Sequence, residues 1–539
     1  MTVSITLDLT ELYDAESTSN WNDASTYSGF QREGNYCLGN QVSQGSGHFY
    51  KSITSTNLSN THIYSWMMLW GNPETEANGG FRIVVGDGTN RIAYHVGGSD
   101  NYGFQVGAWS CFVLNTASPP SNYTTLAGSE SSLSWSAITE VGVGFNATNK
   151  AIGNVDNCFW DICRYGNGLI IKGGTSGDPG TFAEIATDDA STASGKAYGI
   201  VRELQSGVYG VQGRLTFGDS SGTSSTYFKD TDAVIIFEDR AVSSSLYQFN
   251  VVGNSTGTNS FVLGNKLGSG DDALGSNGCT IQSAGPNVSV NFNGSNVDTC
   301  NIYGCKFLNI AGGITLSTDT SHEFIGNTVD QSGQVVANQM IIRNCTFSAT
   351  TDSNNDGSAL LWNGSINIKN CIFNANTDAT NDPHAIEHPD SGTFTYDNLT
   401  FSGNDYDIEF SASSGTLTIN TTNGSNPGTY EITGGGSSVT IVNTVYLTVY
   451  VKDENLNNIE NAQVAIYKSS DDTQLMNEQT DENGMAQETY NYVGDTSIYY
   501  RVRKSSSGGT RYVPFSSYGT ITSDGFTVTV ILYEDNVAV

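Results

Sequence analysis

A short phrase returns five times between Cys300 and Phe401, and it constrains the fold more than any other feature of the sequence. Each copy reads apolar, any residue, Gly/Asn/Asp, Cys/Asn/Leu, any residue, apolar. The fourth position of the phrase is occupied in turn by Cys305, Asn327, Cys345, Cys371 and Leu399, at steps of 22, 18, 26 and 28 residues. An irregular period of about twenty residues, with alternating strands broken by Gly and Asn, predicts the stacked coils of a right-handed parallel β-helix.

The cysteines of the chain suggest redox or metal chemistry until they are placed in this repeat. Nine are present, and none forms the paired C-x-x-C units of a zinc ribbon. Three of them share one position of the phrase with Asn327 and Leu399, and such an exchange is typical of packing. The sequence therefore predicts a stack of buried thiols that behave as small apolar groups.

Three segments follow one another along the chain, and together they predict an all-β protein. Residues 1–166 hold six of the seven tryptophans in short strand-like runs, which predicts a sandwich. Residues 167–443 hold the repeats, and a Gly-rich junction at 167–197 leads into them. Residues 444–539 return to alternating strands. No window carries a long helical pattern, so little helix is expected, and none in the junction.

The net charge and the first residues limit the kinds of partner and location that we expect for the chain. The formal net charge is -32, from 54 acidic and 22 basic residues, which argues against binding nucleic acid. The opening residues Met-Thr-Val-Ser-Ile-Thr-Leu-Asp-Leu show no basic region followed by an apolar one. We therefore expect synthesis in a cytoplasm without a signal peptide, and no membrane span.

The string His384-Ala385-Ile386-Glu387-His388 fits the H-x-x-E-H pattern of one class of zinc proteases. That chemistry needs a helix, which brings both histidines to one zinc ion. Pro383 and Pro389 bracket the string, so a helix there is one turn at most. An exposed loop or an adventitious metal site is the favoured interpretation, with His384, Glu387 and His388 as weak metal-ligand candidates.

A second weak metal motif lies between two of the repeats. Asp352, Asn354 and Asp356, followed by Gly357, match the first half of a calcium loop. Its twelfth position is Asn363 in place of the bidentate glutamate. A polar turn is the favoured interpretation; calcium stays possible, and no other cofactor is expected.

Both end segments resemble known modules. The closing run Phe159-Trp-Asp-Ile-Cys-Arg-Tyr-Gly166 and the strands before it resemble a concanavalin-like jelly roll, in which surface aromatics can stack on sugars. We expect the tryptophans to be core instead, because tryptophan is usually buried. The strings VYVKDENLNNIENAQVAIY and TDENGMA resemble the immunoglobulin-like, transthyretin-like module of carboxypeptidase regulatory domains and bacterial adhesins. That resemblance implies a spacer or docking unit without catalytic residues.

The three-part arrangement resembles the fibre, spike or decoration proteins of tailed bacteriophage virions. It implies a non-enzymatic structural protein of the particle that contributes to attachment to host glycans. Other virion proteins would be its partners, and it would form a homo-oligomer, with a trimer favoured.

A polysaccharide depolymerase of the tailspike type and a bacterial surface adhesin remain alternatives. A depolymerase would need two or three converging carboxylates. The candidates are Asp378, Asp382, Glu387, Asp390, Asp405, Asp407 and Glu409.

Overall fold

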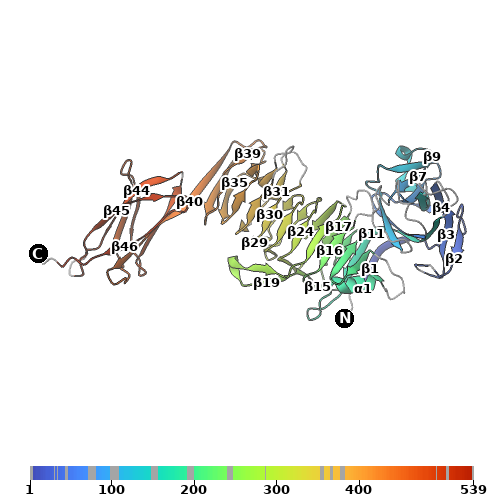
Figure 1. Cartoon of the computed structure of the whole chain (residues 1–539), viewed down its shortest axis with the longest axis horizontal. Coiled ribbons are helices and arrows are strands. Elements are labelled where there is room, and N and C mark those ends of the chain that lie inside the picture. Colours follow the sequence, from blue (N-terminus) through green and yellow to red (C-terminus); the bar gives the residue numbers. More distant parts are fainter. Residues whose placement is uncertain are drawn as a thin grey trace. The chain divides into compact units, whose positions relative to one another are not determined.

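The computed structural model describes residues 4–29, 31–32, 34–42, 46–70, 80–96, 109–146, 156–190, 200–238, 247–285, 287–351, 357–364, 368–376, 383–492, 494–505 and 509–536. The chain divides into two compact units, Met1–Ile366 with Ala375–Pro383, and Asn367–Asn374 with His384–Val539. Strands dominate both units (Figure 1), which confirms the prediction of an all-β protein. None of the helices in the described residues is long and apolar enough to cross a membrane.

The first unit begins with a sandwich of two antiparallel sheets. One sheet holds β1 (Ser4–Tyr13), β2 (Ser25–Tyr27), β3 (Cys37–Val42), β5 (His62–Trp70), β8 (Ser110–Asn115) and the start of β11 (Asp156–Lys172). The other holds β4 (Ser46–Thr56), β6 (Phe81–Gly86), β7 (Arg91–His95), β9 (Tyr123–Ala127) and β10 (Ile138–Asn146), and two 3₁₀ turns precede β10, η2 (Glu130–Ser132) and η3 (Trp135–Ala137).

The tryptophans of this sandwich in the described residues are buried or half-buried. Trp160 is fully buried in the core and stacks on Phe49, with ring centroids 4.7 Å apart, and Trp21 and Trp135 pack half-buried against the same core, as predicted. Trp109 packs against a second, smaller cluster, and Trp66 is buried under the Arg32 guanidinium, whose carbon is 4.4 Å from its ring centroid. The side chain of Trp70 lies outside the described part of the chain. These rings therefore stabilise the sandwich and do not form a sugar-binding face.

Strand β11 changes partners along its length and so begins the solenoid. It pairs antiparallel with β1, β3 and β5, and from Leu169 to Ile171 it also pairs in parallel with β14. The stack that continues from it in the first unit contains β14 (Leu215–Phe217), β17 (Tyr247–Val251), β22 (Val288–Asn291), β25 (Ile314–Thr315), β28 (Val335–Val336) and β31 (Ser358–Leu361).

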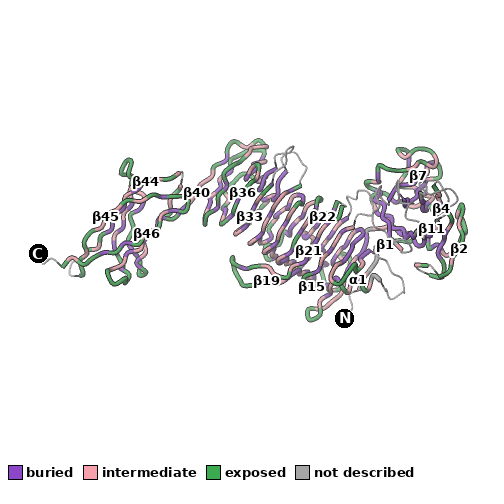
Figure 2. Tube along the Cα trace, viewed as in Figure 1, coloured by how far each residue is buried: buried purple, intermediate pink, exposed green. Residues whose placement is uncertain are grey.

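Two further parallel stacks complete the solenoid of the first unit. One contains β13 (Val208–Val211), β16 (Val234–Phe237), β21 (Thr280–Ser283), β24 (Lys306–Leu308), β27 (Thr328–Asp330) and β30 (Thr346–Ser348), with β12 (Val201–Gln205) antiparallel to β13. The other contains β15 (Thr226–Asp230), β18 (Asn259–Leu263), β23 (Thr299–Tyr303), β26 (Glu323–Ile325) and β29 (Ile341–Arg343). A side hairpin is formed by β19 (Asn265–Leu267), η4 (Gly270–Asp272) and β20 (Leu274–Ser276). Buried residues run through every rung (Figure 2), so the predicted parallel β-helix is confirmed.

A helix covers the beginning of this solenoid, and the expectation of no helix in the junction 167–197 is wrong. α1 (Phe182–Ala190) starts with a capping box: the Thr181 N–H donates to Glu184 Oε2 at 3.0 Å, and the Glu184 N–H donates to Thr181 Oγ1 at 3.3 Å. Phe182 is fully buried against Phe217 and Phe228, at centroid distances of 5.8 and 5.1 Å. The Thr-x-x-Glu signal was in the sequence, but nine residues are too few for a clear helical period.

The repeated phrase has a backbone explanation. Its third residue is Gly304, Gly326, Asn344, Asn370 and Asn398 in the five copies, with φ of 63°, 69°, 54°, 55° and 53°. Only Gly and, at lower cost than other residues, Asn adopt this left-handed conformation readily. The phrase therefore marks the corner at which each coil turns from one stack to the next.

The fourth position of the phrase points inward, as the sequence predicts. All nine cysteines are buried free thiols. A side-chain hydrogen bond with Cys305 and, after it, burial raise the pKa of the Cys279 thiol. Where Asn327 takes the cysteine position, its Oδ1 accepts from the Cys305 N–H at 2.7 Å and its Nδ2 donates to the Ile302 carbonyl at 3.0 Å. A polar side chain can thus replace a thiol because it bonds the neighbouring backbone.

The second unit contains its own parallel rungs. They are built by β34 (His384–His388), β37 (Tyr406–Phe410) and β39 (Tyr430–Ile432), by β33 (Ile372–Asn374) and β36 (Thr400–Ser402), and by β32 (Ile368–Lys369), β35 (Gly392–Asp397), β38 (Thr416–Thr422) and the start of β40 (Ser438–Asp453). His388 points into the interior, where its Nε2 and the Tyr396 hydroxyl share a hydrogen bond of 2.8 Å.

Strand β40 joins these rungs to the C-terminal sandwich. Ser438 to Asn443 pair in parallel with β38, and Asn443 to Tyr450 pair antiparallel with β43 (Met485–Tyr492). β46 (Phe526–Leu532) completes this sheet, and the opposing sheet contains β41 (Gln463–Lys468), β42 (Gln474–Gln479), β44 (Thr496–Arg503) and β45 (Phe515–Ile521). The two sheets enclose one apolar core.

We predict that Gly304→Ala destabilises the first unit by about 1–3 kcal/mol, because a Cβ there adds left-handed strain. That Cβ would also lie 2.7 Å from Ser276 N. Gly177→Ala is the matched control, since its Cβ meets nothing within 4 Å. Urea unfolding, monitored by hydrogen exchange of the amides in β23 and β24, measures the unfolding free energy of each variant. Equal unfolding free energies for Gly304→Ala and Gly177→Ala would contradict the interpretation of Gly304 as a left-handed corner.

The buried His388 predicts a pH-dependent stability. Burial lowers the pKa of His388 to about 3, whereas an unfolded histidine titrates near about 6.5. The unfolded chain therefore takes up the proton first, and stability present above pH 6.5 is lost as the pH falls toward 3. Between pH 7 and 4 the wild type should lose on the order of 3 kcal/mol more unfolding free energy than His388→Gln. Urea titrations at both pH values measure this, and identical pH slopes would disprove it.

Candidate functional site

Three glutamates occupy the same register on three successive rungs of the second unit. Glu387 in β34 pairs with Glu409 in β37, and Glu409 pairs with Glu431 in β39. Their neighbours Ile408 and Phe410 are fully buried in the interior. Because side chains alternate along a strand, the glutamates lie on the outer face, with rungs about 4.8 Å apart. We call these three residues the glutamate ladder.

Hydroxyl groups hold the first two members of the ladder. Ser411 Oγ donates to Glu387 Oε1 at 2.6 Å, and Thr433 Oγ1 donates to Glu409 Oε1 at 2.6 Å. Each hydroxyl comes from the following rung, so the pattern repeats with the coil. Glu431 stands on the last such rung, and no hydroxyl of the described residues donates to it. Its side chain is 36% exposed, which leaves one carboxylate of the ladder facing solvent.

His384 lies between the two later glutamates. Its Nε2 is 3.2 Å from Glu431 Oε2, and its Nδ1 is 3.7 Å from Glu409 Oε2. The imidazole is fully buried and stacks on the ring of Tyr406 at 5.2 Å and 20°. Glu409 is also buried, at 3% exposure. One imidazole thus lies between a buried and a solvent-facing carboxylate, and it is within hydrogen-bond distance of the solvent-facing one, Glu431.

The H-x-x-E-H string does not form the site that its pattern suggests. It is strand β34, a rung of the solenoid, so the expectation of an exposed loop is wrong. His384 faces the glutamate ladder, whereas His388 bonds Tyr396 in the interior, and the two rings do not converge. The described residues contain no group of three His, Cys, Asp or Glu placed to hold a metal ion. The calcium-loop candidates Asp352, Asn354 and Asp356 lie outside the described residues.

The structure brings together two of the seven carboxylates that the sequence offers. Glu387 and Glu409 are in the ladder, whereas Asp390 and Asp405 are exposed on loops. Asp407 accepts from the backbone N–H of Gly428 at 2.7 Å and so holds a turn. Asp378 and Asp382 lie outside the described residues.

Sequence reasoning missed Glu431 entirely. Its signal was the recurrence of Ile386-Glu387, Ile408-Glu409 and Tyr430-Glu431 at steps of 22 residues. This recurrence belongs to a different stack from the repeated phrase. The three glutamates therefore stand out in the sequence only through the period of the solenoid, and no local motif marks them.

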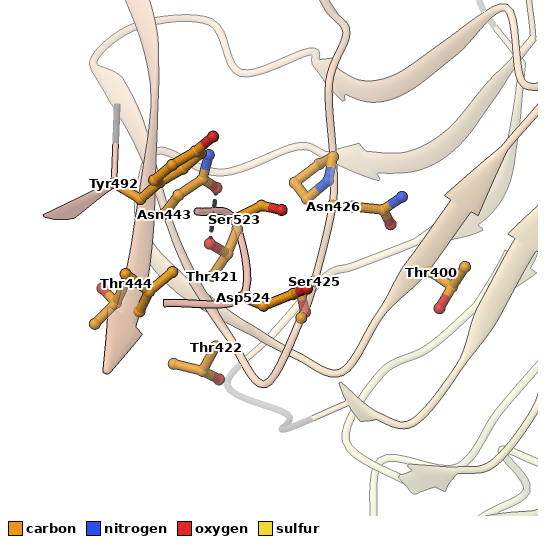
Figure 3. A pocket seen from close by; sticks show the side chains of 13 residues that line it. Thr400, Thr421, Thr422, Ser425, Asn426, Asn443, Thr444, Tyr492, Ser523 and Asp524 are labelled. Carbon is orange, nitrogen blue, oxygen red and sulfur yellow. Dashed lines mark hydrogen bonds between the residues drawn. The ribbon is translucent and has the colours of Figure 1, made fainter. Parts of the chain in front are cut away.

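A polar cavity of about 380 Å³ lies where the last rungs meet the C-terminal sandwich (Figure 3). Hydroxyls and amides line it, and Thr421 Oγ1 donates to Asn443 Oδ1 at 2.8 Å across its wall. Asp524 is the one carboxylate among the lining residues. The cavity can accept a polar ligand, but a single acid cannot supply the acid and base that hydrolysis of a sugar linkage needs. The glutamate ladder is therefore the better candidate for chemistry.

No protein-family model matches the chain, and no curated protein matches it significantly. Among solved structures it is similar to the catalytic domain of Agl-KA, at 11% identity and a TM-score of 0.17, over 81% of this chain and 98% of that one. It is also similar to a GH87 α-1,3-glucanase catalytic domain in complex with tetrasaccharides, at 9% identity and a TM-score of 0.18, over 81% and 98%. A GH87 α-1,3-glucanase catalytic domain in complex with nigerose gives 10% identity and a TM-score of 0.16, over 81% of this chain and 96% of that one. TM-scores this low do not superpose two chains, and no residue role passes from those enzymes to this one.

Proposed function

We propose that the chain binds a polysaccharide on the outer face of β34, β37 and β39 and hydrolyses it with the glutamate ladder. The observation that carries this proposal is that two glutamates in register on adjacent rungs, Glu409 and Glu431, each lie close to a different nitrogen of the His384 imidazole. Hydrolysis of a glycosidic bond needs two carboxyl groups, one to protonate the leaving oxygen and one to act on the other side of the sugar. A flat stack of parallel strands offers an extended surface along which a polymer can lie.

The two glutamates have different surroundings, which suits a division of roles. Glu409 is buried and accepts a hydrogen bond from Thr433, whereas Glu431 faces solvent. In acid–base pairs of this kind the carboxyl in the apolar environment donates the proton, and the solvated one stays ionised. We assign proton donation to Glu409 and activation of water to Glu431, with His384 as the residue that positions both.

Substitution of the ladder tests the proposal. Glu409→Gln and Glu431→Gln should each lower the release of reducing ends from a susceptible bacterial polysaccharide by about 100-fold or more, because each removes one proton-transfer group. Asp405→Asn, an exposed carboxylate outside the ladder, is the matched control and should retain activity. Failure of the wild type to cleave any of a panel of capsular and cell-wall polysaccharides would reject hydrolysis.

A second candidate function is a non-enzymatic fibre, spike or decoration protein of a phage particle that attaches to host glycans. The burial of His384 and Glu409 favours it, since substrate would reach them only after a rearrangement. In this proposal the chain is a virion protein made in the host cytoplasm. It assembles with other virion proteins as a homo-oligomer, with a trimer favoured. An electron-microscopy reconstruction of the particle tests it, and absence of the chain from the particle would reject it.

A further inference from the structure

The four-stranded sheet of the C-terminal sandwich has one covered face and one open face. Its strands run in the order β42, β41, β44, β45. Val464, Ile466 and Ile498 point into the sandwich core and are fully buried. Because side chains alternate along each strand, the residues between them point outward. The open face is therefore defined by the odd-numbered positions of β41 and β44 and by the even-numbered positions of β45.

Three tyrosines lie side by side on this open face. Tyr467, Tyr499 and Tyr518 are register partners on β41, β44 and β45. The rings of Tyr467 and Tyr499 stack at 5.2 Å and 17°, and that of Tyr518 follows at 6.4 Å and 61°. Tyr518 is 80% exposed, so this is not a covered cluster. We call these residues the tyrosine row.

Two arginines stand beside the tyrosine row. The Arg501 guanidinium carbon is 5.2 Å from the ring centroid of Tyr499 and 6.0 Å from that of Tyr467. Arg503 follows two residues later on the same face, and both arginines are exposed. Neither forms an ion pair with a residue in the described part of the chain. In a protein with 54 acidic and 22 basic residues, two adjacent arginines without an acidic partner indicate a place for an external anion.

A groove of about 400 Å³ lies beside Tyr467 and the two arginines, and Tyr499 and Tyr518 lie next to it without lining it. It is lined by Tyr467, both arginines and the polar side chains of Gln463, Asn477 and Ser516. Gln463 Nε2 donates to Asn477 Oδ1 at 2.9 Å, which fixes the orientation of the two amides. The groove thus presents one tyrosine ring of the row, two cations, two amides and a hydroxyl, and its volume lies within the usual range for ligand sites.

We infer that this groove binds an acidic saccharide, a sugar chain that carries carboxylates. The C–H face of a sugar ring packs on the Tyr467 ring, and a uronate carboxylate accepts bidentate hydrogen bonds from Arg501 or Arg503. The amides and Ser516 bond the hydroxyls. The net charge of the chain does not prevent this, because charges beyond about 8 Å are screened at physiological salt. The inference is independent of the glutamate ladder and would give the chain a second glycan-binding site.

Isothermal titration of the full chain with hexagalacturonate, and with neutral maltohexaose of the same length, tests the inference at physiological salt. Hexagalacturonate should bind and maltohexaose should not. Arg501→Gln and Tyr467→Ala should each weaken hexagalacturonate binding by about tenfold or more, since one removes a charge-assisted hydrogen bond and the other removes the tyrosine ring that lines the groove.

The controls are Tyr533→Ala, an exposed tyrosine outside the row, and Lys229→Gln, an exposed cation of the first unit. Both should leave binding unchanged. Equal binding of the two hexasaccharides, no binding of hexagalacturonate, or an equal loss in the controls would overturn the inference. Glu409→Gln should bind hexagalacturonate as the wild type does, so loss of cleavage and loss of this binding are separate results.

Discussion

The parallel hydrogen-bond ladder between rungs is the interaction on which the rest of the structure depends. Within each unit every rung satisfies the backbone of the rung before it, and this requires each coil to turn at the same point. The left-handed corners at Gly304, Gly326 and Asn344 meet that requirement. Once the register is fixed, equivalent side chains lie one above another. The buried thiols and the glutamate ladder are two results of this single constraint, one inside the coil and one outside.

Stacking has a cost where the stacked residues are charged. Glutamates on neighbouring rungs repel one another, and like charges directly opposite in a sheet are destabilising. The structure offsets this repulsion with hydroxyls from the following rung for Glu387 and Glu409, and with His384 for Glu409 and Glu431. Glu431 stands on the last such rung, receives no hydroxyl hydrogen bond from the described residues, and has a side chain that is 36% exposed. The difference in surroundings between Glu409 and Glu431 thus follows from the position of Glu431 on the last rung of the ladder.

The fold was largely predictable from the sequence because its signals are periodic. The corner residues and the shared position of Cys305, Asn327 and Leu399 indicated a solenoid with buried thiols, and both features are present. The candidate site was harder to predict from the sequence than the fold. Whether Glu387 meets Glu409 depends on the exact length of a coil, which insertions between copies obscure. Glu431 carried no motif of its own, and the strand at His384 was hidden by a pattern that is meaningful only on a helix. Helix α1 was missed because its evidence was a capping box rather than a period.

Strand β40 has a mechanical consequence. Its first residues belong to the last rung and its later residues to the C-terminal sandwich, so the two share one continuous backbone segment with no linker. A tension applied to that sandwich along β40 acts parallel to the strand and therefore shears the hydrogen bonds to β38. Six register pairs then resist together, whereas a pull across the strands would open them one after another. The direction of the applied force, more than the number of hydrogen bonds, therefore determines how much force is needed to separate β40 from β38.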